Sequence, residues 1–231
     1  MPAMRLQTDI HSHVLPGIDD GAATIEESLD MLRAFEQQGY NKIITTPHVH
    51  SQRYLNDTEI IKKAYQELQA AMEAESINLR VEYAAEYFAD RHLLKLIEAG
   101  DVLTFGNNYV LCEFSFHMPP VGADRVAEAL KDAGYQPVLA HPERYEYWHG
   151  NKGMFERLRN MGYLFQSNMH AAGGFYGMIP KRNIEMIVNE GWIEFLGTDA
   201  HSPDAIDLIS TTIENKTIQS AILSGVYNHS L

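Results

Sequence analysis

The sequence is poor in features that define several common classes of protein. It has one cysteine, Cys112, so no disulfide can form within the chain and a reducing compartment is indicated. No hydrophobic run approaches the roughly 20 residues of a membrane span, and the first eight residues do not resemble a signal peptide. We therefore expect a soluble, cytoplasmic protein without direct membrane insertion.

Positive charge is also scarce. The chain has 18 Lys and Arg residues against 31 Asp and Glu residues, which gives a formal net charge of −13. Nucleic acids and anionic lipids are bound by basic patches, so neither is an expected partner. A phosphorylated substrate would need local positive charge from arginine or from bound metal ions, which would also cancel part of the acidic excess.

Three sequence patterns of phosphate or nucleotide chemistry are missing. A cysteine-based phosphatase needs a thiolate and an arginine six residues later, but Met118 occupies that position after Cys112. The chain also has neither a P-loop nor a dinucleotide-binding glycine pattern. Any phosphate chemistry must therefore use other groups.

What the sequence does contain is a regular alternation of strand-like and helix-like segments. Thr24 and Glu27 form a capping-box pattern that opens the first helix, which ends near Gly39. About seven β/α units follow one another without a flexible linker, so we predict one domain over residues 1–231. The predicted strands are 6–13, 42–49, 79–88, 109–116, 136–141, 163–169 and 192–199, and the later helices are 57–76, 91–100, 123–134, 154–162 and 179–191.

Candidate metal ligands recur at the ends of these strands. His11 and His13 are two residues apart in an extended segment, so their imidazoles should share one face. Ligands from at least five strand ends would meet at the mouth of a closed barrel, whereas an open sheet gathers its site from fewer strands. The distribution favours an α/β barrel. The candidates are His11, His13, His48, Glu86, Glu113, His141, Asp199 and His201.

This donor set indicates the class of metal. Imidazoles and carboxylates without thiolates suit Mn²⁺, Fe²⁺, Zn²⁺ or Mg²⁺. Carboxylates such as Glu86 could bridge two or three cations, as in metal-dependent phosphoryl transfer. His50 is better interpreted as a loop residue, and His170 has weaker support as a ligand.

Arg144 lies three residues after His141 in the segment His-Pro-Glu-Arg. Its planar guanidinium could bind two phosphate oxygens at once, which makes it a candidate substrate-binding and catalytic residue. The alternative is a salt bridge to Glu143, Glu146 or another acid.

The ordered set of motifs resembles the PHP (polymerase and histidinol phosphatase) superfamily. More narrowly, it resembles the manganese-dependent tyrosine phosphatases of bacterial capsule and exopolysaccharide gene clusters, over about residues 8–202. The loop Asp19-Asp20-Gly21 is the most discriminating motif. The others are His11-x-His13, Thr46-Pro47-His48, Ala85-Glu86, Glu113-Phe114, His141-Pro142-Glu143-Arg144 and Thr198-Asp199-Ala200-His201.

The resemblance implies a distorted (β/α)₇ barrel with up to three metal ions, most simply Mn²⁺. It implies three ligand groups, and it is the reason for choosing Asp20 over Asp19. It also implies a phosphate-contacting role for Arg144, and a phosphotyrosine protein as substrate, such as a tyrosine kinase of polysaccharide synthesis. The implied groups are His11, His13, Glu86 and Asp199; Glu86, Glu113 and His141; and Asp20, His48 and His201.

We therefore expect a metal-dependent phosphomonoesterase, a protein-tyrosine phosphatase in which a metal-bridging hydroxide attacks phosphorus in line. Either a metal ion or a histidine, His48 or His201, would assist the leaving phenolate. The alternatives are a histidinol-phosphate-like small-molecule phosphatase, an amidohydrolase, and a non-enzymatic metal-binding or kinase-docking protein. One departure bears on these choices: the arginine that such enzymes carry after Asp-x-His is replaced by the segment Ser202-Pro203-Asp204-Ala205-Ile206.

Overall fold

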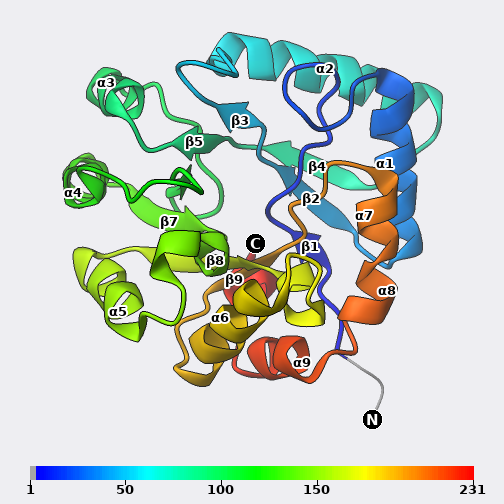
Figure 1. The fold of residues 1–231 in the computed structure, drawn as a ribbon. Coiled ribbons are helices and arrows are strands. Elements are labelled where there is room, and N and C mark those ends of the chain that lie inside the picture. The colour runs from blue at the N-terminus through cyan, green and yellow to red at the C-terminus, as the bar shows by residue number, and fades with distance from the viewer. Residues whose placement is uncertain (1–3) are drawn as a thin grey trace.

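The computed structural model describes residues 4–231, so the first residues of the predicted domain and of the segment tested for a signal peptide lie outside it. Helices surround a central group of strands (Figure 1). The strands are β1 (Thr8–Asp9), β2 (Lys42–Thr45), β3 (His48–Val49), β4 (Arg80–Tyr83), β5 (Glu86–Phe88), β6 (Tyr109–Glu113), β7 (Gln136–Ala140), β8 (Leu164–Asn168) and β9 (Phe195–Gly197). The α-helices are α1 (Ile25–Gln37), α2 (Thr58–Ala74), α3 (Arg91–Ala99), α4 (Ala123–Asp132), α5 (Lys152–Met161), α6 (Met178–Asn189), α7 (Pro203–Asp207), α8 (Ile209–Thr212) and α9 (Lys216–Leu223). Short 3₁₀ helices are η1 (Pro142–Arg144), η2 (Glu146–Trp148), η3 (Met169–Gly173) and η4 (Tyr227–Ser230).

Local signals explain where the longer helices begin. The side chains of Thr24, Asp57 and Asp90 accept hydrogen bonds from backbone N–H groups in the first turns of α1, α2 and α3. Such caps satisfy donors that have no partner within the helix. Within residues 4–231, no helix is both long and apolar enough to cross a membrane.

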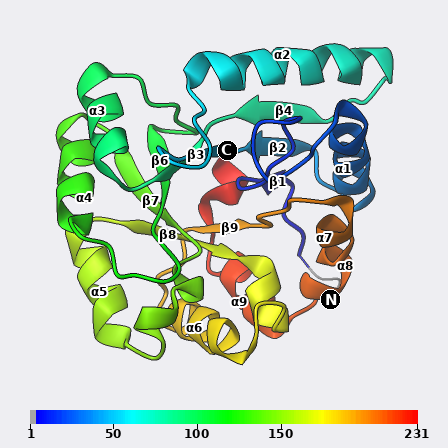
Figure 2. The same cartoon turned by 45° about the horizontal axis from the view of Figure 1, so that its top comes forward.

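All the strand pairings are parallel and fall into two sheets. One sheet has the order β1-β2-β4, and the other has the order β3-β5-β6-β7-β8-β9. The chain passes directly from β2 to β3 and from β4 to β5, so the two sheets form one continuous wall. Figure 2 shows the helices packed around the outside of this wall. The architecture is the expected distorted, parallel α/β barrel.

The wall closes between β1 and β9 with the help of side chains; we call this junction the seam. Near the carboxyl ends, Ser12 and Ala200 form a parallel bridge. Below it, the Asp9 carboxylate accepts hydrogen bonds from the backbone N–H and the hydroxyl of Thr198. Lower still, the Asn228 side chain donates to the carbonyls of Thr8 and Leu196 and accepts from the Leu196 N–H. A residue of η4 thus replaces strand pairing.

The interior of the barrel is apolar below the candidate ligands. It contains Ile10, Ile44, Leu111, Val138 and Phe195, all at most 1% exposed. Leu231 packs against this cluster and lies so close to Gly106 that a Cβ there would approach the Leu231 Cδ2 to 2.4 Å. The end of the barrel opposite the ligands is therefore covered by the last residues of the chain.

Two strand predictions were wrong in one respect. Residues 42–49 and 79–88 each form two short strands rather than one. Pro47 has no N–H to donate, so the first segment cannot continue its hydrogen bonding without a break. The neighbouring segment, 79–88, breaks at Ala84 and Ala85. The Ala84 N–H donates to the carbonyl of Thr45, before Pro47, and the Glu86 N–H donates to the carbonyl of Pro47 itself. The bend turns His48 and Glu86, which are paired in register, toward the barrel mouth.

Candidate metal centre

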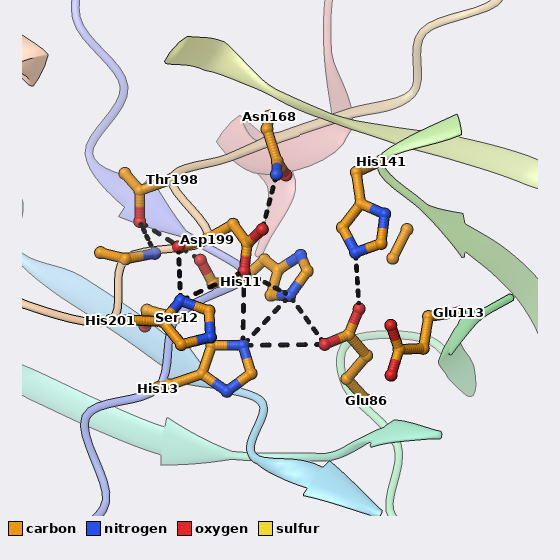
Figure 3. Close-up of polar contacts among 12 residues, drawn as sticks. His11, Ser12, His13, Glu86, Glu113, His141, Asn168, Thr198, Asp199 and His201 are labelled. Atoms are coloured by element: carbon orange, nitrogen blue, oxygen red, sulfur yellow. Dashed lines mark hydrogen bonds and ion pairs between the residues drawn. The ribbon is translucent and has the colours of Figure 1, made fainter. Parts of the chain in front are cut away.

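The first strand is shorter than the predicted 6–13, and two imidazoles follow its end at Asp9. They meet on the same side of the chain, as the spacing predicts. The Nε2 atoms of His11 and His13 are 3.4 Å apart, and both side chains are fully buried. Figure 3 shows them pointing toward Glu86 and Asp199. The half-site expected from the His-x-His spacing is present in the geometry.

Glu86 lies at the centre of the cluster. Its Oε2 is 3.2 Å from His11 Nε2 and 3.0 Å from His48 Nδ1, and its Oε1 is 3.0 Å from His141 Nε2. The side chain is fully buried. One carboxylate therefore faces imidazoles from three different strand ends, as a bridging ligand would.

Asp199 divides its two oxygens between different partners. Its Oδ1 lies 3.4 Å from the Nε2 atoms of both His11 and His13 and 3.6 Å from His201 Nδ1. Its Oδ2 accepts 2.7 Å hydrogen bonds from Arg144 and Asn168. One oxygen is thus held by fixed donors while the other faces the histidines.

The backbone at two candidate ligands is strained. His141 and Asp199 have positive φ angles of 36° and 53°, which non-glycine residues rarely adopt. Both residues come directly after or close to the end of a strand, β7 or β9. Such strain typically costs on the order of 1–3 kcal/mol and concentrates at functional sites.

The neighbouring aspartates of the Asp-Asp-Gly loop have different roles. The buried Asp19 carboxylate lies 2.7 Å from His13 Nδ1 and accepts the backbone N–H groups of Gly21 and His48. Asp20 is more exposed, and its Oδ1 lies 3.5 Å from the Nε2 atoms of both His48 and His201. Asp20 therefore faces the cluster, whereas Asp19 orients His13 from behind.

Gly21 is required here by a close approach. A Cβ at this position would lie 2.1 Å from the carbonyl oxygen of His13 and 2.4 Å from its Cβ. The loop can fold back over the first strand only because that atom is absent.

The nine expected ligand residues converge, in four overlapping groups whose donor atoms lie within 4.8 Å of one another. The grouping differs in part from the one that the resemblance implies. His13 joins Asp20, His48 and His201, and the implied group of Glu86, Glu113 and His141 is divided, because Glu113 lies with His48 and Glu86 whereas His141 lies with His11 and Asp199. The groups are His13, Asp20, His48 and His201; His11, His141 and Asp199; His11, His13 and Glu86; and His48, Glu86 and Glu113.

The electrostatics of the cluster favour a cation at its centre. Burial opposes charge on His11, but attraction to Glu86 and Asp199 outweighs it and raises the His11 pKa to about 9. Burial likewise opposes ionisation of Glu86, but the nearby His11 and His48 hold its pKa well below the usual range. The carboxylates thus attract positive charge, which protons or divalent cations can supply.

Nine buried side-chain atoms of the described residues lack a hydrogen-bond partner, and three of them belong to candidate ligands: Glu86 Oε2, His48 Nδ1 and His141 Nδ1. The first two face each other across 3.0 Å. Buried polar atoms are nearly always hydrogen-bonded, so unpaired atoms among oxygen and nitrogen donors fit a divalent metal ion. The residues present therefore suit the metal that their pattern predicts.

Sequence reasoning missed two residues that orient ligands, Gln166 and Asn168. The Asp199 carboxylate can only accept, so Asn168 must present its NH₂ group to it. The Asn168 oxygen then accepts from Gln166 Nε2 at 3.0 Å, which leaves Gln166 Oε1 to accept from His11 Nδ1 at 2.8 Å.

This chain of amides fixes the tautomer of His11. In the neutral form that binds a metal, the proton lies on Nδ1, so the Nε2 lone pair faces Glu86 and Asp199. The sequence does contain a signal for these two residues. Gln166 and Asn168 are two positions apart on β8, so their amide side chains share one face of a strand that carries no candidate ligand of its own.

Arg144 is fixed beside the cluster. Its guanidinium carbon lies 4.6 Å from the centre of the Phe116 ring and 4.2 Å from that of Tyr176. Arg144 does form the salt bridge of the alternative interpretation, but with another acid, Asp199, rather than with Glu143 or Glu146: its Nη1 donates to Asp199 Oδ2 at 2.7 Å. The remaining donors of the fork are available for a substrate anion.

Three other expectations concern residues near the site. The His50 ring lies against Phe88, with centroids 4.2 Å apart and planes tilted by 33°, and it accepts the Gln52 N–H; His50 belongs to none of the four groups. His170 is buried against Thr212, also outside those groups. The segment after His201 forms α7, where Ile206 is fully buried, so this position contributes packing rather than a guanidinium.

Comparison with known proteins agrees with this geometry. Residues 7–207 match the family model for capsular polysaccharide synthesis, CpsB/CapC. Tyrosine-protein phosphatase YwqE of Bacillus subtilis (strain 168) is 32% identical over 203 residues, which cover 84% of this chain and 77% of YwqE.

Solved structures give the same result. The crystal structures of YwqE from Bacillus subtilis and CpsB from Streptococcus pneumoniae, metal-dependent tyrosine phosphatases, include a match with a TM-score of 0.81 at 29% identity, covering 94% of this chain and 85% of the other. A histidinol phosphate phosphatase from Lactococcus lactis shares the fold, with a TM-score of 0.58 at 12% identity over 96% of this chain and 94% of the other. The chain therefore belongs to the CpsB/CapC family of capsular polysaccharide synthesis proteins.

Proposed function

We propose that this protein is a metal-dependent protein-tyrosine phosphatase. The observation that carries the proposal is the convergence of nine imidazole and carboxylate side chains around Glu86 and Asp199, with Arg144 held beside them. The tyrosine phosphatase activity of its relatives supports the choice of substrate. Phosphate would bind where Arg144 and the metal ligands meet.

The proposed ligands are His11, His13, Asp20, His48, Glu86, Glu113, His141, Asp199 and His201, with Mn²⁺ as the proposed metal. When bound, divalent cations supply Lewis acidity that activates water and neutralises charge on phosphate oxygens. The protein holds Asp199 and His11 through Asn168 and Gln166, so the site is oriented before substrate arrives.

Arg144 is proposed to bind the non-bridging phosphate oxygens. The Phe116 and Tyr176 rings confine its guanidinium plane, and its bond to Asp199 ties it to the ligand set. A confined fork loses little entropy when it binds an oxyanion, so it can stabilise the transition state.

His48 and His201 have two proposed roles, metal ligand and proton donor to the leaving phenolate. His201 is the more exposed, with a side chain 32% exposed against 13% for His48. Proton donation would matter most for poor leaving groups. If His201→Gln keeps its metal content but loses more activity on phosphotyrosine than on an aryl phosphate with an acidic phenol, His201 is the donor.

The physiological substrate is proposed to be a phosphotyrosine protein, such as a tyrosine kinase of polysaccharide synthesis, in the cytoplasm. The deciding experiment measures phosphate release from a phosphotyrosine peptide and from histidinol phosphate by metal-stripped protein, with and without Mn²⁺. Mn²⁺-dependent release from the peptide supports the proposal. Release from histidinol phosphate alone, or from neither, contradicts it.

Replacing Arg144 tests the phosphate-binding role separately. Arg144→Ala should lower kcat/KM by roughly 10²–10³-fold because the phosphate contact is lost, while metal content stays unchanged because Asn168 still donates to Asp199 Oδ2. Metal content measured by plasma mass spectrometry distinguishes the possibilities. Loss of metal from this variant would assign Arg144 to holding Asp199 instead.

A further inference from the structure

A cleft of about 460 Å³ opens beside Arg144. Three loops line it, and they follow the consecutive strands β6, β7 and β8. Phe116 comes from the first loop, Arg144 and His149 from the second, and Met178 and Ile179 from the third, at the start of α6. The cleft is therefore on the same end of the barrel as the candidate metal centre.

The walls of the cleft expose unusually large apolar side chains. Among residues 4–231, eleven large hydrophobic side chains are exposed, and five of them lie on the loops after β6 and β8. Met178 and Ile179, 59% and 44% exposed, line the cleft itself, and Met118 and Phe175 are next in sequence to the lining residues His117 and Tyr176. Such clustering marks a surface that another molecule covers.

The cleft is continuous with the site through Arg144. The same guanidinium contacts Asp199, a candidate ligand, and is flanked by Phe116 and Tyr176 in the cleft wall. A phosphate held by Arg144 would direct its ester group into the cleft, past the edges of these rings. The chain carrying that ester would then reach Met178 and Ile179.

We infer that this cleft binds the polypeptide around the phosphotyrosine and prefers an apolar side chain next to it. The inference rests on the proposed function. A small phosphate ester would occupy only the region near Arg144 and leave Met178 and Ile179 uncovered. An acidic neighbour is disfavoured because its carboxylate would lose water against the apolar Met178 and Ile179, and because the one carboxylate of the lining, Glu146, would repel it.

Matched phosphopeptides test this preference. Three peptides of equal length carry Leu, Ser or Asp on both sides of the phosphotyrosine, and free phosphotyrosine is the reference. With Mn²⁺ present, kcat/KM for the Leu peptide should exceed that for the Asp peptide by about tenfold or more, with Ser between them, since one buried apolar side chain contributes that much. Free phosphotyrosine reports on the reaction without the flanking contacts.

Met178→Asp should remove the preference for Leu while leaving hydrolysis of free phosphotyrosine within about twofold. Leu223→Asp is the matched control, because Leu223 is 70% exposed on α9, outside the residues that line the cleft. This control should change neither the preference for the Leu peptide nor the hydrolysis of free phosphotyrosine. If thermal melting shows that Met178→Asp is unfolded, Ile179→Ser takes its place.

The outcomes separate the two proposals. Equal kcat/KM for the three peptides, with free phosphotyrosine hydrolysed, overturns the inference and leaves the phosphatase function intact. A preference for Asp also overturns it. If neither free phosphotyrosine nor any peptide is hydrolysed with Mn²⁺, the proposed function fails and the inference fails with it.

Discussion

The two ends of the barrel have opposite roles, one in binding and one in stability. At the carboxyl ends of the strands, buried carboxylates and imidazoles crowd around Glu86 and Asp199, and two of these residues have strained backbones. At the other end, Asn228 satisfies the backbone of β1 and β9, and Leu231 packs on the apolar interior. The first end is arranged for binding at a cost in stability, whereas the second supplies stability. Substitutions at the two ends should therefore have separable effects.

Asp199→Ala should give the largest effect. Removing the carboxylate that faces three histidines should lower activity on a phosphotyrosine peptide by on the order of a thousandfold or more, with loss of bound metal. Asp204→Ala, an exposed carboxylate on α7, is the control and should be fully active. Phosphate release and metal content measure both. A fully active Asp199→Ala would refute the proposed centre.

Gln166→Leu should act on the metal without touching it. Loss of the acceptor for His11 Nδ1 should weaken metal affinity by about 10–100-fold, as is typical when a ligand loses its orienting partner. Titration with Mn²⁺ while activity is followed measures this change. Ser167→Ala, the buried neighbour on β8, should leave affinity unchanged. Equal Mn²⁺ affinities for the two variants would show that Gln166 contributes only packing and does not orient His11.

Asn228→Ala should affect stability rather than chemistry. It removes three hydrogen bonds to the backbone of Thr8 and Leu196, so the free energy of unfolding should fall by about 2–4 kcal/mol. Urea unfolding measures this loss, with the exposed Asn78→Ala as control. The folded variant should keep its specific activity within about twofold. A proportionate loss of activity would mean that the two ends are not separable.

His170 should give a smaller, pH-dependent effect. Burial lowers its pKa from 6.5 to about 4, so the unfolded chain binds a proton in this range while the folded chain does not. Its contribution is present above pH 6.5 and is lost as the pH falls toward 4. In urea unfolding with EDTA, the wild type should lose about 2 kcal/mol more than His170→Gln between pH 7.5 and pH 5. The exposed His229→Gln should follow the wild type.

The sequence predicted the convergence of the candidate ligands far better than it predicted how the opposite end of the barrel closes. Candidate ligands lie at strand ends, and parallel strands bring such positions to one face whatever the details of pairing. The break at Pro47 was visible locally and was overlooked. The seam could not be predicted from strand positions, because Asn228 donates to the carbonyl of Thr8 across 220 positions of the sequence and no motif surrounds it. Gln166 and Asn168 were missed because amides at strand spacing are common.

The seam also has a consequence for how the protein is made. His11 and Asp199 belong to its two sides, since the backbone N–H of Asp199 bonds to the carbonyl of His11. The centre therefore straddles the last junction of the barrel to close. Because a ribosome delivers β1 first and Asn228 only after β9, that junction cannot be completed on a nascent chain that stops short of residue 228. Metal loading should then be a late event of synthesis, and a prematurely terminated chain should emerge inactive rather than partly active.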